Sequence, residues 1–301
     1  MIQSVTVTNY VGDSLEMVLN TPQSSGFNIT SIEGIGPVES SINSTELSTM
    51  DGSIYTGARS SSRNIVIDLA FYGDNIEELR HKSYRYFPIK KQLELVFKTD
   101  ERTCRINGYV EKNEPVIFSQ SEATQISVIC MNPWFQSYNP QRTEFSAVRP
   151  LFEFPFSNES LDEKLLEMGE IIHNDHKSFL YLGDVETGFT LTIHVTGTQI
   201  GNISIYNVDT RENIDIDVDK LAKIVGGPLT VGDDIIISTI NGNKYAHFIR
   251  QGVTYNILNA INRDADWFQL SRGVNTFAYT AESGDVNLQL SIENPILYEG
   301  I

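Results

Sequence analysis

The feature that most constrains the fold of this sequence is a period-two alternation of apolar and polar residues. Successive side chains of a β-strand point to opposite faces, so each alternating segment can place one apolar face on a core. The apolar positions of the clearest segments in the first half are Ile65, Ile67, Leu69 and Phe71; Leu93, Leu95 and Phe97; and Ile126, Val128 and Cys130. Those of the second half are Phe189, Leu191, Ile193 and Val195; Ile214, Ile216 and Val218; Phe277 and Tyr279; and Val286, Leu288, Leu290 and Ile292. The sequence therefore predicts a mainly β protein.

One helix interrupts the strands of the first half. Asp74-Asn75 offers a cap, Glu77 and Glu78 fall in the first turn where the helix dipole favours anions, and Pro88 ends the helix beyond Tyr86. Its polar face, continued by Lys90 and Lys91, is basic; these residues are Arg80, His81, Lys82 and Arg85. This basic face is either simply solvated or docks on an acidic neighbour.

The length of 301 residues favours two domains, each with its own core. The sequence changes character between residues 132 and 158, where four prolines lie among aromatic and polar residues. We predict a first domain over 1–140, a linker over 141–149 and a second domain over 150–301. Closely spaced turn signals, such as Asn241-Gly242 and Gln251-Gly252, make the second domain an antiparallel sandwich or jelly roll. The segment from Leu161 to Ile172 has an ambiguous helical pattern.

Composition excludes several classes of function. The formal net charge of −17 argues against nucleic acid as a partner, because phosphate binding needs an excess of Lys and Arg. No window approaches the roughly 20 apolar residues that span a bilayer, and the first residues lack the layout of a signal peptide, so we expect the chain to fold in a cytoplasm. Cys104 and Cys130 lie in alternating apolar runs and are expected to be buried, reduced thiols.

No pattern in the sequence indicates catalysis or a cofactor. Asp215, Asp217 and Asp219 resemble part of a calcium loop, but Lys220 stands where such a loop needs glycine, so we interpret this segment as an exposed strand edge. A nucleophile elbow, a phosphate-binding loop and a dinucleotide fingerprint are all missing from the sequence. We therefore expect no enzyme activity, no cofactor and no metal.

The least core-like stretch of the first domain runs from Met50 to Arg63. It is polar, contains glycines and directly precedes the strongest strand, which suits a projecting hairpin. This segment is either a mobile loop or an arm that reaches a neighbouring subunit. The side chains that we expect at such an interface are Asp51, Tyr55, Arg59 and Arg63.

Trp267 and Phe268 are the aromatic residues that we single out in the second domain. An exposed aromatic pair on a β-sandwich can stack on sugar rings. Packing inside the sandwich is the favoured interpretation, and carbohydrate binding is the alternative.

Several landmarks of the first domain, in this order and spacing, resemble phage distal tail proteins of the siphophage-type tail family. They are Ile32-Glu33-Gly34-Ile35-Gly36-Pro37; Asp51-Gly52-Ser53; Arg63-Asn64-Ile65-Val66-Ile67; Tyr84-Arg85-Tyr86-Phe87-Pro88; Gly108-Tyr109-Val110-Glu111; and the segment from Ile126 to Phe135. In the second half the resemblance is thinner and rests on Trp267-Phe268-Gln269-Leu270 and Gly273-Val274-Asn275-Thr276-Phe277.

The resemblance implies a β-barrel or split-barrel-like first domain with one α-helix and a projecting hairpin, followed by a galectin-like sandwich. It also implies a homo-hexameric ring at the tail tip of a virion, with a belt hairpin over Ser48 to Arg63 that contacts the next subunit. The implied partners are the major tail tube protein, a tail-associated hub or lysin protein, and a receptor-binding protein or cell-wall glycan. The alternative function is a carbohydrate-binding or receptor-binding module in the second domain.

Overall fold

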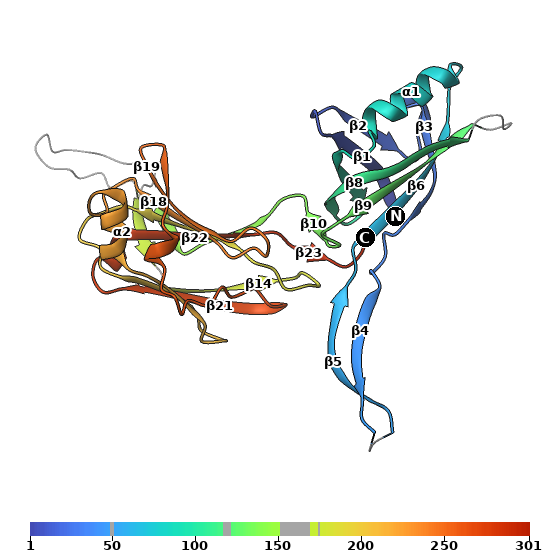
Figure 1. Cartoon of the computed structure of the whole chain (residues 1–301). Coiled ribbons are helices and arrows are strands. Elements are labelled where there is room, and N and C mark those ends of the chain that lie inside the picture. The colour runs from blue at the N-terminus through green and yellow to red at the C-terminus, as the bar shows by residue number, and fades with distance from the viewer. Residues whose placement is uncertain (49–50, 117–121, 151–168, 174) are drawn as a thin grey trace, which may run out of the picture. The chain divides into compact units, whose positions relative to one another are not determined.

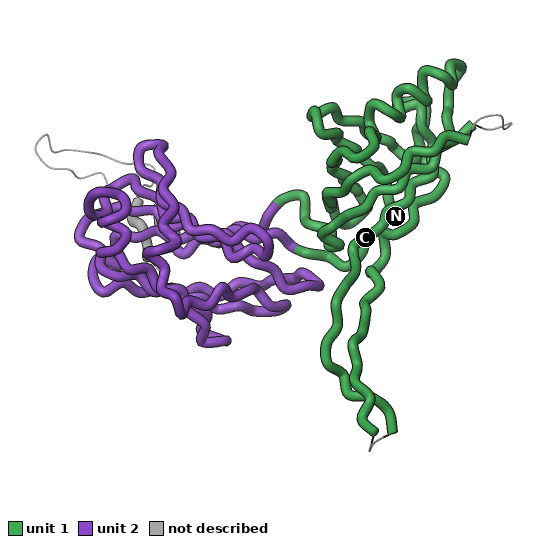
Figure 2. Tube along the Cα trace, in the orientation of Figure 1, with its two compact units in different colours: residues 1–139, 297–301 green, residues 140–296 purple. Residues whose placement is uncertain are grey.

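The computed structural model describes residues 1–48, 51–116, 122–150, 169–173 and 175–301. The chain divides into two compact units, which Figure 2 distinguishes by colour. Unit 1 consists of Met1–Asn139 together with Leu297–Ile301, and unit 2 consists of Pro140–Ile296. Among the described residues, no helix is long and apolar enough to cross a membrane.

Unit 1 is an antiparallel sheet with a helix and a hairpin (Figure 1). Its elements are β1 (Ile2–Asn9), β2 (Ser14–Val18), η1 (Pro22–Ser24), β3 (Phe27–Glu33), β4 (Ser40–Glu46), β5 (Ser53–Ser60), β6 (Arg63–Phe71), α1 (Ile76–Tyr86), β7 (Gln92–Thr99), β8 (Thr103–Val116), β9 (Ala123–Cys130), β10 (Phe135–Ser137) and β23 (Leu297–Tyr298). The strand order is β2-β1-β7-β8-β9-β6-β3, and β10 pairs with both β8 and β23.

The predicted alternation forms the core of unit 1. The inward residues of β6, β7 and β9 are fully or almost fully buried, as the sequence predicts, whereas Phe71 at the end of β6 is only partly buried. Cys104 and Cys130 are buried free thiols, which confirms that prediction. Burial raises the pKa of Cys104 to about 11 and that of Cys130 to about 12, so both stay protonated at neutral pH.

Unit 2 is built from two antiparallel sheets that enclose one core. Its elements are β11 (Gln141–Glu144), β12 (Ser146–Pro150), β13 (Gly169–His173), β14 (His176–Tyr181), β15 (Thr190–Val195), β16 (Ile203–Asn207), β17 (Asn213–Ile216), α2 (Val218–Val225), β18 (Asp234–Ser238), β19 (Tyr245–Arg250), β20 (Val253–Asn256), η2 (Leu258–Ala260), β21 (Gly273–Ala281), η3 (Asp285–Asn287) and β22 (Leu288–Asn294). One sheet has the order β11-β22-β15-β18-β19-β20 and the other β14-β21-β16-β17, while β12 and β13 pair with each other. The mainly β fold with antiparallel sheets is confirmed.

Three expectations for unit 2 are wrong. The expected linker over 141–149 is structured, because β11 pairs with β22 and β12 with β13. The Asp215–Asp219 segment is not a strand edge throughout: Asp217 caps α2, its side chain accepting a hydrogen bond from the Lys220 amide at 2.8 Å. Val286 lies in η3 and is exposed instead of inward-facing.

Two further expectations concern the candidate helix from Leu161 to Ile172 and the C-terminal residues. For the helical candidate from Leu161 to Ile172, residues 161–168 lie outside the described residues, and the rest belongs to β13. The C-terminal residues from Leu297 onward, which the sequence assigned to the second domain, belong to unit 1. There β23 pairs with β10, and the Ile301 amide donates to the Ile35 carbonyl at 3.1 Å.

Candidate functional site: the hairpin and its anchor

The most exposed element of unit 1 is the β4–β5 hairpin, which leaves the body of the unit as a separate two-stranded sheet (Figure 1). Every residue of β4 is exposed, and so are most residues of β5. The arm thus begins at Ser40, earlier than the predicted start at Ser48, because the preceding serine-rich segment supplies the partner strand. A two-stranded hairpin is at best marginally stable alone in water, so the attachment of this arm to the body of unit 1 is decisive for its position.

Each face of the hairpin carries one exposed isoleucine. Cross-strand partners share a face, and the register places Ile42 and Ala58 on the same face as Ser44 and Tyr55. Thr56 is an extra residue of β5 at a bulge, so Ile54 and Arg59 lie together on the other face, with their partners Thr45 and Ser41. We call these the Ile42 face and the Ile54 face; Ile42 and Ile54 are 69% and 50% exposed.

Arg63 fastens both ends of the arm to the body of unit 1. Its side chain is 2% exposed, and its guanidinium lies over the Phe135 ring, 4.4 Å from the centroid. Burial lowers the pKa of this guanidinium from its ordinary value. Arg63 is therefore not an exposed interface residue, which corrects that part of the sequence prediction.

The Arg63 guanidinium donates to four backbone carbonyls. Nη1 reaches the oxygens of Gly34 and Gly36, both at 2.5 Å, Nε reaches Pro133 at 2.7 Å, and Nη2 reaches Glu299 at 2.6 Å. Gly34 and Gly36 precede the arm and Arg63 follows it, so a single side chain holds the entry and the exit together. Gly34 has φ +79°, and a Cβ there would lie 1.9 Å from the Asn64 oxygen, which makes glycine obligatory.

The other expected interface residues occupy different positions on the arm. Tyr55 is 65% exposed and Arg59 is also exposed, whereas Asp51 lies in the turn between the strands. No described residue pairs with the Arg59 guanidinium or the Asp51 carboxylate. The sequence thus identified exposed residues on both faces of the arm but missed its two exposed isoleucines, Ile42 and Ile54.

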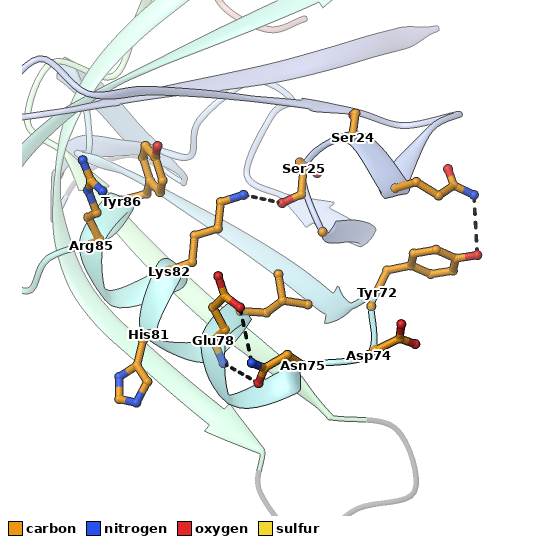
Figure 3. Close-up of a pocket in the computed structure, with 14 residues that line it drawn as sticks. Ser24, Ser25, Tyr72, Asp74, Asn75, Glu78, His81, Lys82, Arg85 and Tyr86 are labelled. Carbon is orange, nitrogen blue, oxygen red and sulfur yellow. Dashed lines mark hydrogen bonds between the residues drawn. The ribbon is translucent and has the colours of Figure 1, made fainter.

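Helix α1 forms as predicted, with Asn75 as its cap; the Asn75 side chain accepts from the Glu78 amide at 3.2 Å. Figure 3 shows the groove beside this helix, with a volume of about 660 Å³. The cations of the helix have local partners. Lys82 donates to the Ser25 carbonyl at 2.8 Å, and Arg85 pairs with Asp13 at 2.7 Å.

Arg80 and His81 complete this local pairing, since both lie within 4 Å of the same carboxylate, that of Glu77. Arg80, His81 and Arg85 thus have carboxylate partners within unit 1, whereas Lys82 donates to a carbonyl and keeps its charge. These local pairs favour the solvated interpretation over docking on an acidic neighbour.

In unit 2, the aromatic pair separates into a buried and a half-buried residue. Phe268 is 2% exposed and its ring packs against Phe189 and Phe277, so it cannot stack on a ligand. Trp267 is partly exposed at the edge of the core, with the Lys244 ammonium 5.8 Å from its ring centroid. Of this pair, only Trp267 has a partly exposed side chain. Among the described residues, no group of three or more His, Cys, Asp or Glu side chains could hold a metal ion.

Comparison with known proteins agrees with this architecture. Residues 19–128 match the family model of the phage tail protein RIFT-related domain. No curated protein matches the chain. Among solved structures, the SPP1 Dit protein, described as a paradigm of the hub adsorption apparatus in phages that infect Gram-positive bacteria, is similar with a TM-score of 0.64 and 12% identity; the match covers 97% of this chain and 98% of that one.

Two structures of the phage p2 baseplate in its activated conformation are also similar. The strontium form has a TM-score of 0.51 and 11% identity, with 96% of this chain and 97% of that chain covered. The calcium form has a TM-score of 0.52 and 11% identity, with 97% and 98% covered. Residues 19–128 are therefore similar to the phage tail protein RIFT-related domain, and the chain has the fold of the SPP1 Dit protein and of the phage p2 baseplate structures.

Proposed function

We propose that this chain is a non-enzymatic subunit of a phage tail tip, and that six copies form a ring that connects the tail tube to the baseplate. The observation that carries the proposal is the exposed hairpin, whose two ends Arg63 fixes to the body of unit 1. A rigidly rooted arm presents its exposed isoleucines at a constant angle. A single heterologous contact closes into a ring of six when each copy is turned by one sixth of a full turn from the last.

The partners follow from this role. One side of such a ring meets the major tail tube protein, and the other meets a hub or lysin protein and the receptor-binding apparatus. Synthesis takes place in the cytoplasm of the bacterial host, and the protein ends in the virion.

Light scattering on the full chain over a range of concentrations tests the ring. We expect a mass about six times the 33.8 kDa of one chain. A variant in which a short Gly-Ser turn replaces Ser40–Ser60, with Gly34 and Arg63 retained, should stay folded but monomeric. An unchanged mass for this variant would refute the role of the hairpin, and a full-length chain that is monomeric both alone and with tail tube protein would refute the ring.

Unit 2 supports a second function, binding of a receptor or carbohydrate at the host surface. The supporting observation is a groove of about 480 Å³ that lies entirely within unit 2 and is lined by one aromatic, one aliphatic and five polar or charged side chains.

A further inference from the structure

The groove in unit 2 lies on the outer side of the sheet that contains β16 and β17. Its lining residues come from these two strands and from the turn between them: Ser204, Tyr206, Asn207, Val208, Arg211, Asn213 and Asp215. The alternate residues of β16, Ile203 and Ile205, are fully buried in the core. The strand thus fixes which side chains face the groove.

Tyr206 stands among shorter side chains on this outer face. Its cross-strand partners are Ala278 on β21 and Asn213 on β17, and the next outward residue of its own strand is Ser204. The ring is partly exposed. A planar aromatic ring that rises above small neighbours offers a flat apolar face to a ligand.

The turn beside the ring is rigid. Asn207 is 2% exposed, and its side-chain oxygen accepts from the amides of Asp209 at 2.9 Å and Thr210 at 3.3 Å. The Arg211 amide donates to the Asn207 carbonyl at 2.8 Å, which holds Arg211 at φ +67°. A non-glycine residue in this region of φ is uncommon, and here it places the arginine in the groove wall.

The polar atoms of the groove keep unused hydrogen-bonding capacity. Within the described part of the chain, the Tyr206 hydroxyl, the Ser204 hydroxyl and the Arg211 guanidinium make no hydrogen bond or ion pair. Asn213 Nδ2 donates to Asp215 Oδ2 at 2.9 Å, which leaves one oxygen of each of these side chains free to accept from a ligand. Donors and acceptors therefore surround the ring.

We propose that this groove binds a saccharide unit, with one sugar face on the Tyr206 ring and sugar hydroxyls on Arg211, Asn213 and Asp215. Sugar rings combine an apolar C–H face with a rim of hydroxyls that donate and accept, which matches both parts of the groove. One guanidinium and one carboxylate give the lining no net charge, so the groove does not favour a polyanion. The inference rests on the second proposed function and names its site; it is independent of ring formation.

The first experiment is to probe the full chain on an array of bacterial cell-wall glycans, followed by calorimetric titration with each oligosaccharide that binds. We expect at least one neutral or N-acetylated oligosaccharide to bind, and Tyr206→Ala to weaken it by about tenfold or more. Tyr206→Phe keeps the ring, so its dissociation constant for the oligosaccharide should stay within about threefold of that of the natural protein. Arg211→Asn removes the guanidinium with a residue that tolerates positive φ, and should weaken binding without loss of folding.

Trp267→Ala is the matched control, because it alters an aromatic residue outside the groove. If binding survives Tyr206→Ala and Arg211→Asn but is lost in Trp267→Ala, the groove assignment is wrong while sugar binding by unit 2 stands. Absence of binding to every glycan would overturn both. Light scattering on Tyr206→Ala should give the mass of the unaltered chain, which separates this result from the fate of the ring.

Discussion

At the residue scale, Arg63 joins four separate segments of unit 1. Arg63→Ala leaves the carbonyls of Gly34, Gly36, Pro133 and Glu299 without their charged donor inside the protein. Hydrogen bonds to a charged group contribute about 1.5–3 kcal/mol each in favourable cases, but neighbouring terms are not additive. We expect a loss of about 3–5 kcal/mol in the free energy of unfolding of unit 1.

The two tryptophans allow this loss to be assigned to one unit. Trp134 belongs to unit 1 and Trp267 to unit 2, so urea unfolding followed by fluorescence in a Trp267→Phe background reports on unit 1. Arg59→Ala is the control, since Arg59 is exposed on the arm, and it should change stability by less than about 0.5 kcal/mol. Equal stabilities for Arg63→Ala and Arg59→Ala would show that the four-carbonyl clamp contributes nothing.

The Asp233 carboxyl makes the stability of unit 2 depend on pH. Burial alone would raise the pKa of this carboxyl, but hydrogen bonds from Arg250 and Thr230 outweigh it and hold the pKa below its ordinary value. A carboxyl whose pKa is lowered by folding stabilises the folded state at pH values above its pKa in the unfolded state, about 3.9. This contribution disappears as the pH falls through the pKa of the folded state. Unit 2 should therefore lose stability on acidification below about pH 4.

Asp233→Asn tests the contribution of this carboxyl separately from all others. The variant should be less stable than the natural protein at pH 7, and the difference should shrink as the pH is lowered toward about 2. Urea unfolding in a Trp134→Phe background, followed by the fluorescence of Trp267, measures this difference in stability. A difference that is the same at both pH values would mean that the pKa of Asp233 is the same in the folded and unfolded states.

At the element scale, the two faces of the hairpin can be distinguished by their effect on association. If the Ile42 face docks on the next subunit, Ile42→Asp places a charge in a desolvated contact and should abolish association, whereas Arg59→Ser on the opposite face should have a small effect. Analytical ultracentrifugation of both variants measures the difference. The reverse order would assign docking to the face that carries Ile54 and Arg59.

Elements with local signals could be predicted, and those defined by distant contacts could not. Helix α1 has a cap, acidic residues in its first turn and a proline beyond it, so its bounds follow from the sequence. Helix α2 was missed because Ile214, Ile216 and Val218 continue the strand alternation across its cap at Asp217, although Gly226 in the left-handed conformation marks its end.

The residues of the candidate sites show the same difference between local signals and distant contacts. An exposed polar hairpin is visible in the sequence, but the burial of Arg63 is not, because its carbonyl partners are 27 to 236 positions away along the chain. The Tyr206 groove was missed for a similar reason. Its small neighbour Ala278 lies on β21, and only strand pairing brings the two together.

At the scale of the whole molecule, the last residues of the chain complete the first unit. Leu297 and Tyr298 pair with β10, the Glu299 carbonyl accepts from Arg63, and the Ile301 amide donates to Ile35. The chain thus leaves unit 1 at Asn139 and returns to it after Ile296. Because the hairpin begins and ends at the Arg63 clamp, the C-terminal segment supports the base of the arm.

Removal of residues 297–301 should therefore destabilise unit 1 and leave unit 2 unchanged. The truncation removes one of the four Arg63 acceptors and the strand beside β10, so we expect a loss of about 2–3 kcal/mol from the free energy of unfolding that Trp134 reports. The Trp267 signal should not move, because β22 ends at Asn294 within unit 2. A chain extended by a short polar tail after Ile301 controls for altering the terminus. If the truncation shifted the Trp267 transition and left that of Trp134 in place, the last residues would belong energetically to unit 2.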